Sequence, residues 1–277
     1  MATIWSHLRR WFGVSPSASP GATIGRTMPI SITHTTGSSY RVTSSIDGLL
    51  NERSETTQPE RSLEELLATV RRLSPAESPF GVEVTDFREF AGSMLSVTTD
   101  PDVANRFREL RHSRREELRS AQPASAVSIA CNLSYPHEGD HDDGPIFLAK
   151  EMEDKWDIFL YDSHLFFTRS WTGRLAFKAE IHLETPRARI QRLLVSGDTL
   201  EKDFFIGVVD FLIKSHLYRV IAPHPLPPSL RGDVAQAAIY SFREYGRWGI
   251  FGTHAPVTDF RVHRKQGGGY ELRVSNS

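Results

Sequence analysis

The sequence has little of several features that would narrow its function. It contains one cysteine, Cys131, so no disulfide can form within the chain, and this suits a reducing compartment. No stretch approaches the ~20 uninterrupted apolar residues of a membrane span, and the first residues lack the apolar region of a secretory signal. The net charge is -1, so no excess of one sign points to nucleic acid. We therefore expect a cytoplasmic protein that does not bind nucleic acid.

Catalytic motifs of the familiar kinds are also missing. The sequence has no P-loop, no G-x-G-x-x-G, no G-x-S-x-G, no HExxH and no paired C-x-x-C. Triads and carboxylate pairs assemble from distant positions, so these absences do not exclude an enzyme. They leave the reaction class and any cofactor unknown.

The most strongly patterned stretch runs from Glu151 to Glu180 and is typical of a sheet. Aromatic and β-branched residues form three runs, at 156–161, 165–169 and 174–183, separated by Asp162-Ser163 and by Trp171-Thr172-Gly173. Residues 127–135 alternate strictly between apolar and polar, with Cys131 on the apolar side as a core thiol. We predict an α+β fold whose mostly antiparallel sheet is a meander of at least four strands around 127–183.

Helices are predicted to cover this sheet. Apolar residues at helical spacing and capping residues such as Ser62 and Asp100 indicate helices at 62–73, 86–96, 101–119, 187–195, 200–221 and 233–245. The most apolar of these, 200–221, is the expected cover of the sheet, and 257–264 with 270–274 is predicted to be a hairpin. We expect a single domain over 26–277, in which 60–120 is a candidate helical subdomain.

Residues 1–25 are predicted to be a short amphipathic helix on a linker. Ile4, Trp5, Leu8, Trp11 and Phe12 share one helical face, and a stretch rich in Ser, Pro and Gly follows Gly13. Residues 4–12 are a candidate contact with a membrane surface or a partner. The alternative is a helix that folds back onto its own domain.

The best candidate site is the turn Arg169-Ser170-Trp171-Thr172-Gly173, called the corner below. Arg169 can hold a phosphate or carboxylate by a bidentate fork, Trp171 offers a stacking plane, and Gly173 permits close approach of a ligand. Ser170 and Thr172 supply hydroxyls, and Trp156 and Asp154 are the expected neighbours. The structural alternative, which we favour, places Trp171 in the core and pairs Arg169 with Asp154 or Asp157.

Two further groups of polar residues are weaker candidates. His137, Glu138, Asp140 and His141 are metal-ligand types, but their spacing matches no known metal motif and a solvated turn is the simpler interpretation. Glu151 and Glu153 would share one face of a strand entrance as a general acid and base. The sequence predicts that this acidic run is exposed. Paired catalytic carboxylates usually need burial to separate their pKa values, so we do not expect catalysis there.

The segment MEDKWDIFLYDSHLFFTRSWTG, at 152–173, resembles a segment of uncharacterised bacterial proteins in which the RSWTG corner recurs. Hairpins ending in WTG are also similar to some in proteins near ADP-ribose metabolism. The resemblance implies that Arg169 and Trp171 matter, and it supplies no mechanism.

The leading hypothesis is a non-enzymatic interaction or accessory protein that contacts another protein through the corner. The alternative is a binder of, or an enzyme acting on, a nucleotide-like anionic ligand of the ADP-ribose or NAD type at the same residues. The third hypothesis is a metal-binding protein that uses the 137–143 loop.

Overall fold

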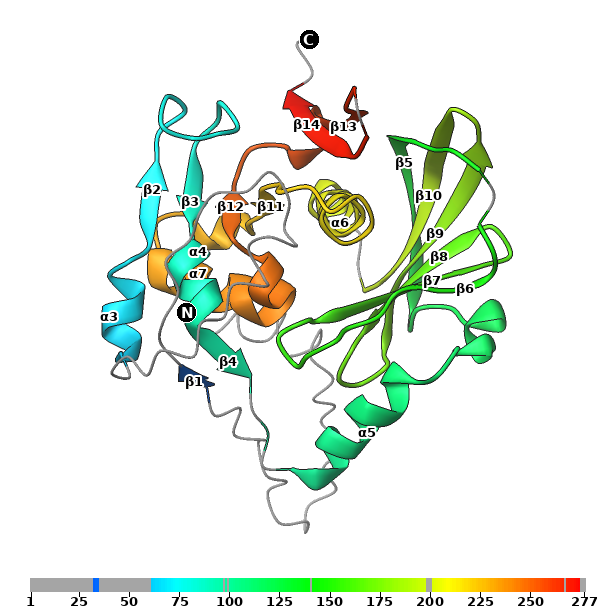
Figure 1. Cartoon of the computed structure of the whole chain (residues 1–277), viewed down its shortest axis with the longest axis horizontal. Coiled ribbons are helices and arrows are strands. Elements are labelled where there is room, and N and C mark those ends of the chain that lie inside the picture. Colours follow the sequence, from blue (N-terminus) through cyan, green and yellow to red (C-terminus); the bar gives the residue numbers. More distant parts are fainter. Residues whose placement is uncertain are drawn as a thin grey trace.

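The computed structural model describes residues 32–34, 61–96, 98, 100–139, 141–197, 201–266 and 268–274. The predicted N-terminal helix and its linker lie outside these residues, as does Asp140. In the described part, no helix is both long enough and apolar enough to cross a membrane. The fold is α+β, with mostly antiparallel sheets, as the sequence predicts (Figure 1).

The largest element is a six-stranded antiparallel sheet in the order β5-β10-β9-β8-β7-β6. Its strands are β5 (Ala126–Pro136), β6 (Gly144–Phe147), β7 (Trp156–Tyr161), β8 (His164–Arg169), β9 (Leu175–Glu184) and β10 (Arg187–Ser196). Consecutive strands from β6 to β10 are neighbours, so the predicted meander is confirmed. The edge strand β5 lies beside β10 and completes the sheet.

Helix α6 (Lys202–Leu212) lies against the concave face of this sheet (Figure 1). Its residues Phe205, Val208 and Phe211 pack with Ile158 and Phe167 of the sheet in the main core. A π-helical turn, Ile213–Leu217, ends the helix before the predicted limit at 221. The predicted covering role of this helix is confirmed.

The opposite face of the sheet is covered by α5 and a 3-10 helix. Asp100 caps α5 (Pro101–Arg111), and Leu118 of the 3-10 segment Glu116–Ser120 packs with Phe159, Tyr161 and Phe166. The prediction of one helix over 101–119 is wrong, because Arg115 adopts a left-handed conformation with φ 54° that interrupts it.

A second sheet has the order β11-β12-β3-β2 and lies beyond α6 (Figure 1). Its strands are β2 (Arg71–Leu73), β3 (Val84–Asp86), β11 (His224–Pro225) and β12 (Phe251–Thr253), with helices α3 (Leu63–Leu67), α4 (Arg88–Ser93) and α7 (Val234–Tyr245) beside them. The helices predicted at 62–73 and 86–96 are therefore too long. Residues 71–73 and 84–86 pair as strands, and β4 (Met94–Ser96) pairs with β1 (Ile32–His34).

The helix predicted at 187–195 is wrong, because these residues form β10. The buried residues are Ala188, Ile190, Leu193 and Val195, and a bulge between Ile190 and Arg192 changes their parity. This break in the alternation imitates helical spacing. The predicted C-terminal hairpin is confirmed as β13 (Phe260–Arg264) paired with β14 (Tyr270–Val274).

Candidate functional site

The corner connects β8 to β9, and its arginine is hydrogen-bonded to residues of α7. The Arg169 guanidinium donates to the Glu244 carbonyl at 3.1 Å, to the Glu244 carboxylate at 3.2 Å and to the Arg243 carbonyl at 2.8 Å. It also lies over the Trp156 ring, 4.7 Å from its centroid. The sequence predicts a pairing of Arg169 with Asp154 or Asp157, and Glu244 takes that place instead.

The other polar groups of the corner are bound to the loop that precedes β7. The Ser170 hydroxyl donates to the Asp154 carbonyl at 2.6 Å, and the Trp171 indole N–H donates to the Met152 carbonyl at 2.8 Å. Ser170 is buried and Trp171 is half-buried, whereas Thr172 is exposed. The structure thus brings together Asp154, Trp156 and the corner, and it uses their polar atoms to join segments of the fold.

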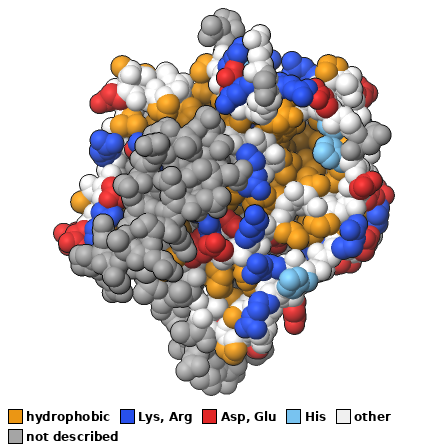
Figure 2. Space-filling model, viewed as in Figure 1, with side chains coloured by type: hydrophobic (Ala, Val, Ile, Leu, Met, Phe, Trp, Pro, Cys, Tyr) orange, Lys and Arg blue, Asp and Glu red, His pale blue; other side chains and the backbone are white. Residues whose placement is uncertain are grey.

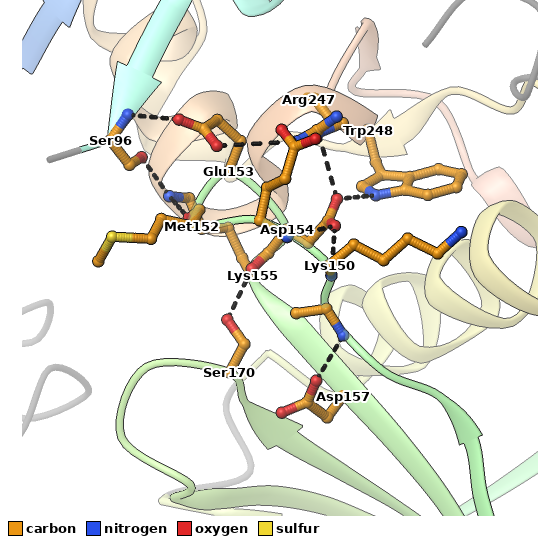
Figure 3. A network of polar contacts seen from close by, with 12 residues as sticks. Ser96, Lys150, Met152, Glu153, Asp154, Lys155, Asp157, Ser170, Arg247 and Trp248 are labelled. Atoms are coloured by element: carbon orange, nitrogen blue, oxygen red, sulfur yellow. Dashed lines mark hydrogen bonds and ion pairs between the residues drawn. The ribbon is translucent and has the colours of Figure 1, made fainter. Parts of the chain in front are cut away.

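Two residues of the acidic run before β7, Glu153 and Asp154, are buried, which corrects the interpretation from sequence, whereas Glu151 is exposed as predicted. Glu153 is 7% exposed and Asp154 is 5% exposed. Arg247, which follows α7, ion-pairs with Glu151, with Glu153 at 3.7 Å and with Asp154 at 3.2 Å (Figure 3). The Trp248 indole N–H donates to Asp154 at 2.9 Å. We call residues 151–155 with Arg247 and Trp248 the latch.

Lys155 is the most unusual group in the latch. Its amine donates to the Ser96 hydroxyl at 2.5 Å and to the Met152 carbonyl at 2.8 Å (Figure 3). The same amine lies 4.7 Å from the Trp171 ring centroid. Burial, and then the positive charge of Arg169, lower the pKa of Lys155 from 10.5 to about 7. A substantial fraction of this amine is therefore neutral at physiological pH.

A neutral amine beside a hydroxyl is the arrangement of a general base and a serine nucleophile. Two features of this pair favour a structural role instead. Ser96 and Lys155 are each only 7% exposed, and the Ser96 backbone N–H is held by the Glu153 carboxylate at 2.8 Å. The pair joins β4 to the latch, and we assign it no reaction.

Asp157 is a second buried group whose ionisation is perturbed. Its carboxylate accepts the Ala149 N–H at 2.7 Å, and burial raises its pKa from 3.8 to about 6. A raised carboxyl pKa is common at catalytic sites, but it also occurs in structural networks. In this case the carboxylate fixes the loop that enters β7.

Arg174, the first residue after the corner, differs from its neighbours. It lies across from Arg169, whose N–H donates to the Arg174 carbonyl at 3.0 Å. Burial, and then the charge of Arg169, lower the pKa of Arg174, while Glu244 raises it. Among the described residues, no hydrogen bond or ion pair engages its guanidinium.

The loop proposed as a metal site follows β5. The His137 and His141 rings are 5.3 Å apart, His137 is buried, and Glu138 ion-pairs with Arg264. The part of the chain that the structure describes contains no group of three His, Cys, Asp or Glu side chains suited to a metal. Because Asp140 lies outside that part, the metal site stays a prediction.

Two other features lie close to α6. Lys214 and Asp210 form a buried ion pair to which Tyr135 donates a hydrogen bond of 2.7 Å. A groove of about 390 Å³ lies between β5, the start of α6 and residues 253–258. None of the residues that line this groove belongs to the corner.

Comparison with models of protein families, with curated proteins and with solved structures finds no match to this chain. The resemblance of residues 152–173 to bacterial proteins with an RSWTG corner therefore stays a prediction. The site must be interpreted from its own geometry.

Sequence reasoning missed Lys155, Ser96, Glu244, Arg247 and Arg174. Four of these five lie on segments that meet the corner only through the fold. A signal was present for Lys155, because a lysine directly before an apolar strand is an unusual start for a buried run.

Proposed function

We propose that this chain is a non-enzymatic interaction protein of the cytoplasm that contacts another protein through the surface around the corner. The observation that supports this function is the engagement of the corner's own polar atoms. Arg169, Ser170 and Trp171 are hydrogen-bonded to backbone carbonyls of the same chain, so these side chains hold the fold in place. A reaction at the corner would need such groups to be free to move protons or bind substrate.

The surface beside the corner is suited to a contact of this kind. Thr172 is exposed, and Arg106 of α5 is exposed while its Nε–H donates to the Thr172 carbonyl at 2.9 Å. Figure 2 shows Lys and Arg side chains gathered over α5 and the middle of the same face. Small-molecule sites are usually concave. The groove of about 390 Å³ is lined by no residue of the corner, so a small molecule bound in it would not contact Arg169 or Trp171.

Site-specific photocrosslinking in the native cell tests this function. A benzoylphenylalanine at the position of Thr172 is expected to capture one defined protein, identified by mass spectrometry. The control places the same residue at Val274, which is 46% exposed on β14. Absence of an adduct at 172, or the same adducts at both positions, would count against the proposal.

The hypothesis that the protein is an enzyme can be tested separately at Ser96 and Lys155. If this pair acted as nucleophile and base, a fluorophosphonate probe would label Ser96 in the folded protein, and Lys155→Met would abolish the labelling. We expect no labelling, because both side chains are buried. Labelling of Ser96 would contradict the proposed interaction function and favour a hydrolytic enzyme.

The predicted helix at 4–12 adds a second candidate contact. Removal of residues 1–20 is expected to change the distribution of the protein between membrane and soluble fractions if this helix binds a membrane surface. An unchanged distribution would eliminate the membrane contact.

A further inference from the structure

Arg169, the last residue of β8, and Arg174, directly before β9, form a like-charged pair across the turn. The backbone hydrogen bond of 3.0 Å between them places the two residues opposite each other, and like charges in that position are destabilising. Arg169 is compensated by the Glu244 carboxylate and two carbonyls. Arg174 is half-buried and has no bonding partner among the described residues.

The negative charge of Glu244 acts on both of these arginines, but only Arg169 is hydrogen-bonded to it. Oxygen Oε2 of Glu244 accepts from Arg169, while Oε1 is buried and has no hydrogen-bond partner among the described atoms. Glu244 acts on Arg174 only by electrostatic attraction, without a direct hydrogen bond. The site thus has a surplus positive charge in a partly desolvated position, where an added anion is stabilised more than on an open surface.

Most backbone N–H groups of the corner are already hydrogen-bonded, and this limits the anion that it suits. The N–H groups of Thr172 and Gly173 donate to the Arg169 carbonyl at 3.3 and 2.7 Å, and that of Ser170 donates to the Lys155 carbonyl at 3.1 Å. The Arg174 N–H faces the Thr172 hydroxyl at 3.3 Å. Polyphosphate sites commonly use a cradle of such amides. With these amides engaged, side-chain guanidinium groups supply most of the recognition, and their fork matches a carboxylate.

We propose that Arg174, directly after the corner, is the specific contact for a carboxylate on an acidic protein partner. Exposed Arg106 contacts the corner at Thr172. This inference rests on the proposed interaction function and names the chemistry of the partner. The bound carboxylate pairs with the Arg174 guanidinium, which no side chain of the described residues engages. Arg169 acts only by positioning the strand pair.

The experiment measures binding of a fluorescein-labelled oligoglutamate peptide to the full chain by fluorescence anisotropy at low salt. Arg174→Gln is expected to weaken binding at least about fivefold, and Arg174→Lys to retain part of it, since a lysine keeps the charge but loses the fork. Arg261→Gln is the matched control, because Arg261 is an exposed arginine on β13. This control is expected to bind as the native protein does. An oligoglutamine peptide of the same length is expected not to bind.

Three results would overturn the inference. The first would be that Arg174→Gln, verified as folded by its melting temperature, binds the peptide as tightly as the native protein. The second would be that Arg261→Gln weakens binding as much as Arg174→Gln, which would mean that the charge acts diffusely. The third would be that ADP or pyrophosphate binds through Arg174 more tightly than oligoglutamate, which would mean that the anion is a phosphate.

The photocrosslink at Thr172 separates this inference from the proposed function. A partner captured equally in the native and Arg174→Gln proteins would refute the carboxylate contact and leave the interaction function in place. Failure to capture any partner in the native protein would refute the interaction function itself.

Discussion

Lys155 shows how burial makes a single side chain sensitive to pH. Its pKa is about 7 in the folded protein and 10.5 when unperturbed, so the unfolded chain binds the extra proton between these values. Stability therefore rises with pH across this range, and the unfavourable contribution of Lys155 is complete below pH 7. The amine sits between the rings of Trp171 and Phe242, which an uncharged side chain of similar length would also contact.

We expect Lys155→Met to gain stability relative to the native protein as pH falls from 10 to 7, by on the order of 3 kcal/mol. Urea unfolding at several pH values measures this difference. Lys150→Met, at an exposed lysine of the same loop, is the control and should show no such trend. A difference that does not vary with pH would contradict the assignment.

Gly246 is the residue at which the latch depends most directly on backbone geometry. Its φ of 60° and ψ of -135° favour glycine, and a Cβ there would lie 1.6 Å from the Glu153 carbonyl oxygen. Because that oxygen belongs to the backbone, it cannot move aside cheaply.

Gly246→Ala is expected to lose more than about 4 kcal/mol of unfolding free energy, or not to fold. Gly81→Ala is the matched control. Gly81 also has a positive φ, of 69°, but a Cβ there meets no atom within 4 Å. Its cost should be only about 1 to 2 kcal/mol of backbone strain. Equal losses in the two variants would show that the contact with Glu153 is unimportant.

At the scale of elements, the latch joins the β6–β7 loop to the segment after α7. Arg247 is 13% exposed in its side chain and faces Glu153 and Asp154, whose side chains are 10% and 7% exposed. Removing the cation would leave these buried carboxylates without their ion-pair partner. The loss is much larger than for an exposed pair.

Arg247→Met should therefore destabilise the protein by about 3 to 5 kcal/mol. Arg273→Met is the control, since Arg273 pairs with Glu271 on the surface of β14 with its side chain 62% exposed. That change should cost less than about 1 kcal/mol. Chemical denaturation of both variants decides the question, and a small loss for Arg247→Met would mean that the latch is not a major source of stability.

At the scale of the whole molecule, two buried histidines make the folded protein less stable at acidic pH. His216 stacks on Trp248 and His224 lies 4.4 Å from the Tyr245 ring, and burial lowers the pKa of each from 6.5 to about 3. The unfolded chain binds these two protons below pH 6.5 while the folded chain does not. Stability is present above pH 6.5 and is lost as pH falls. Asp157 and Asp210, whose pKa values are raised by burial, partly offset this loss.

We expect the unfolding free energy to be lower at pH 4.5 than at pH 6, and His224→Phe to make this pH dependence shallower by about 1 kcal/mol per pH unit. His112→Gln, at an exposed position on the end of α5, should leave the slope unchanged. Thermal and urea unfolding across this range provide the measurement. An identical slope in His224→Phe would exclude His224 as a source of the pH dependence.

The local pattern of the sequence determined the elements with continuous periodicity. Strands β5, β7 and β8, the cap of α5 at Asp100, and the apolar helix α6 follow from alternation, helical spacing and capping residues, which act between near neighbours. Where tertiary contacts competed, the local pattern failed. The bulge in β10 imitated a helix, and residues 71–73 became a strand by pairing with β3.

The candidate site depended on contacts that no local pattern contains. The sequence indicated that Arg169 and Trp171 lie at a turn, where they could either contribute to the core or bind a ligand. Only the tertiary structure decided that Glu244 holds Arg169 and that Arg247 neutralises the acidic run. It also decided that Arg174 has no partner among the residues that the structure describes. Glu244 follows Arg169 by 75 positions along the chain, and burial of a charge depends on which distant segment covers it.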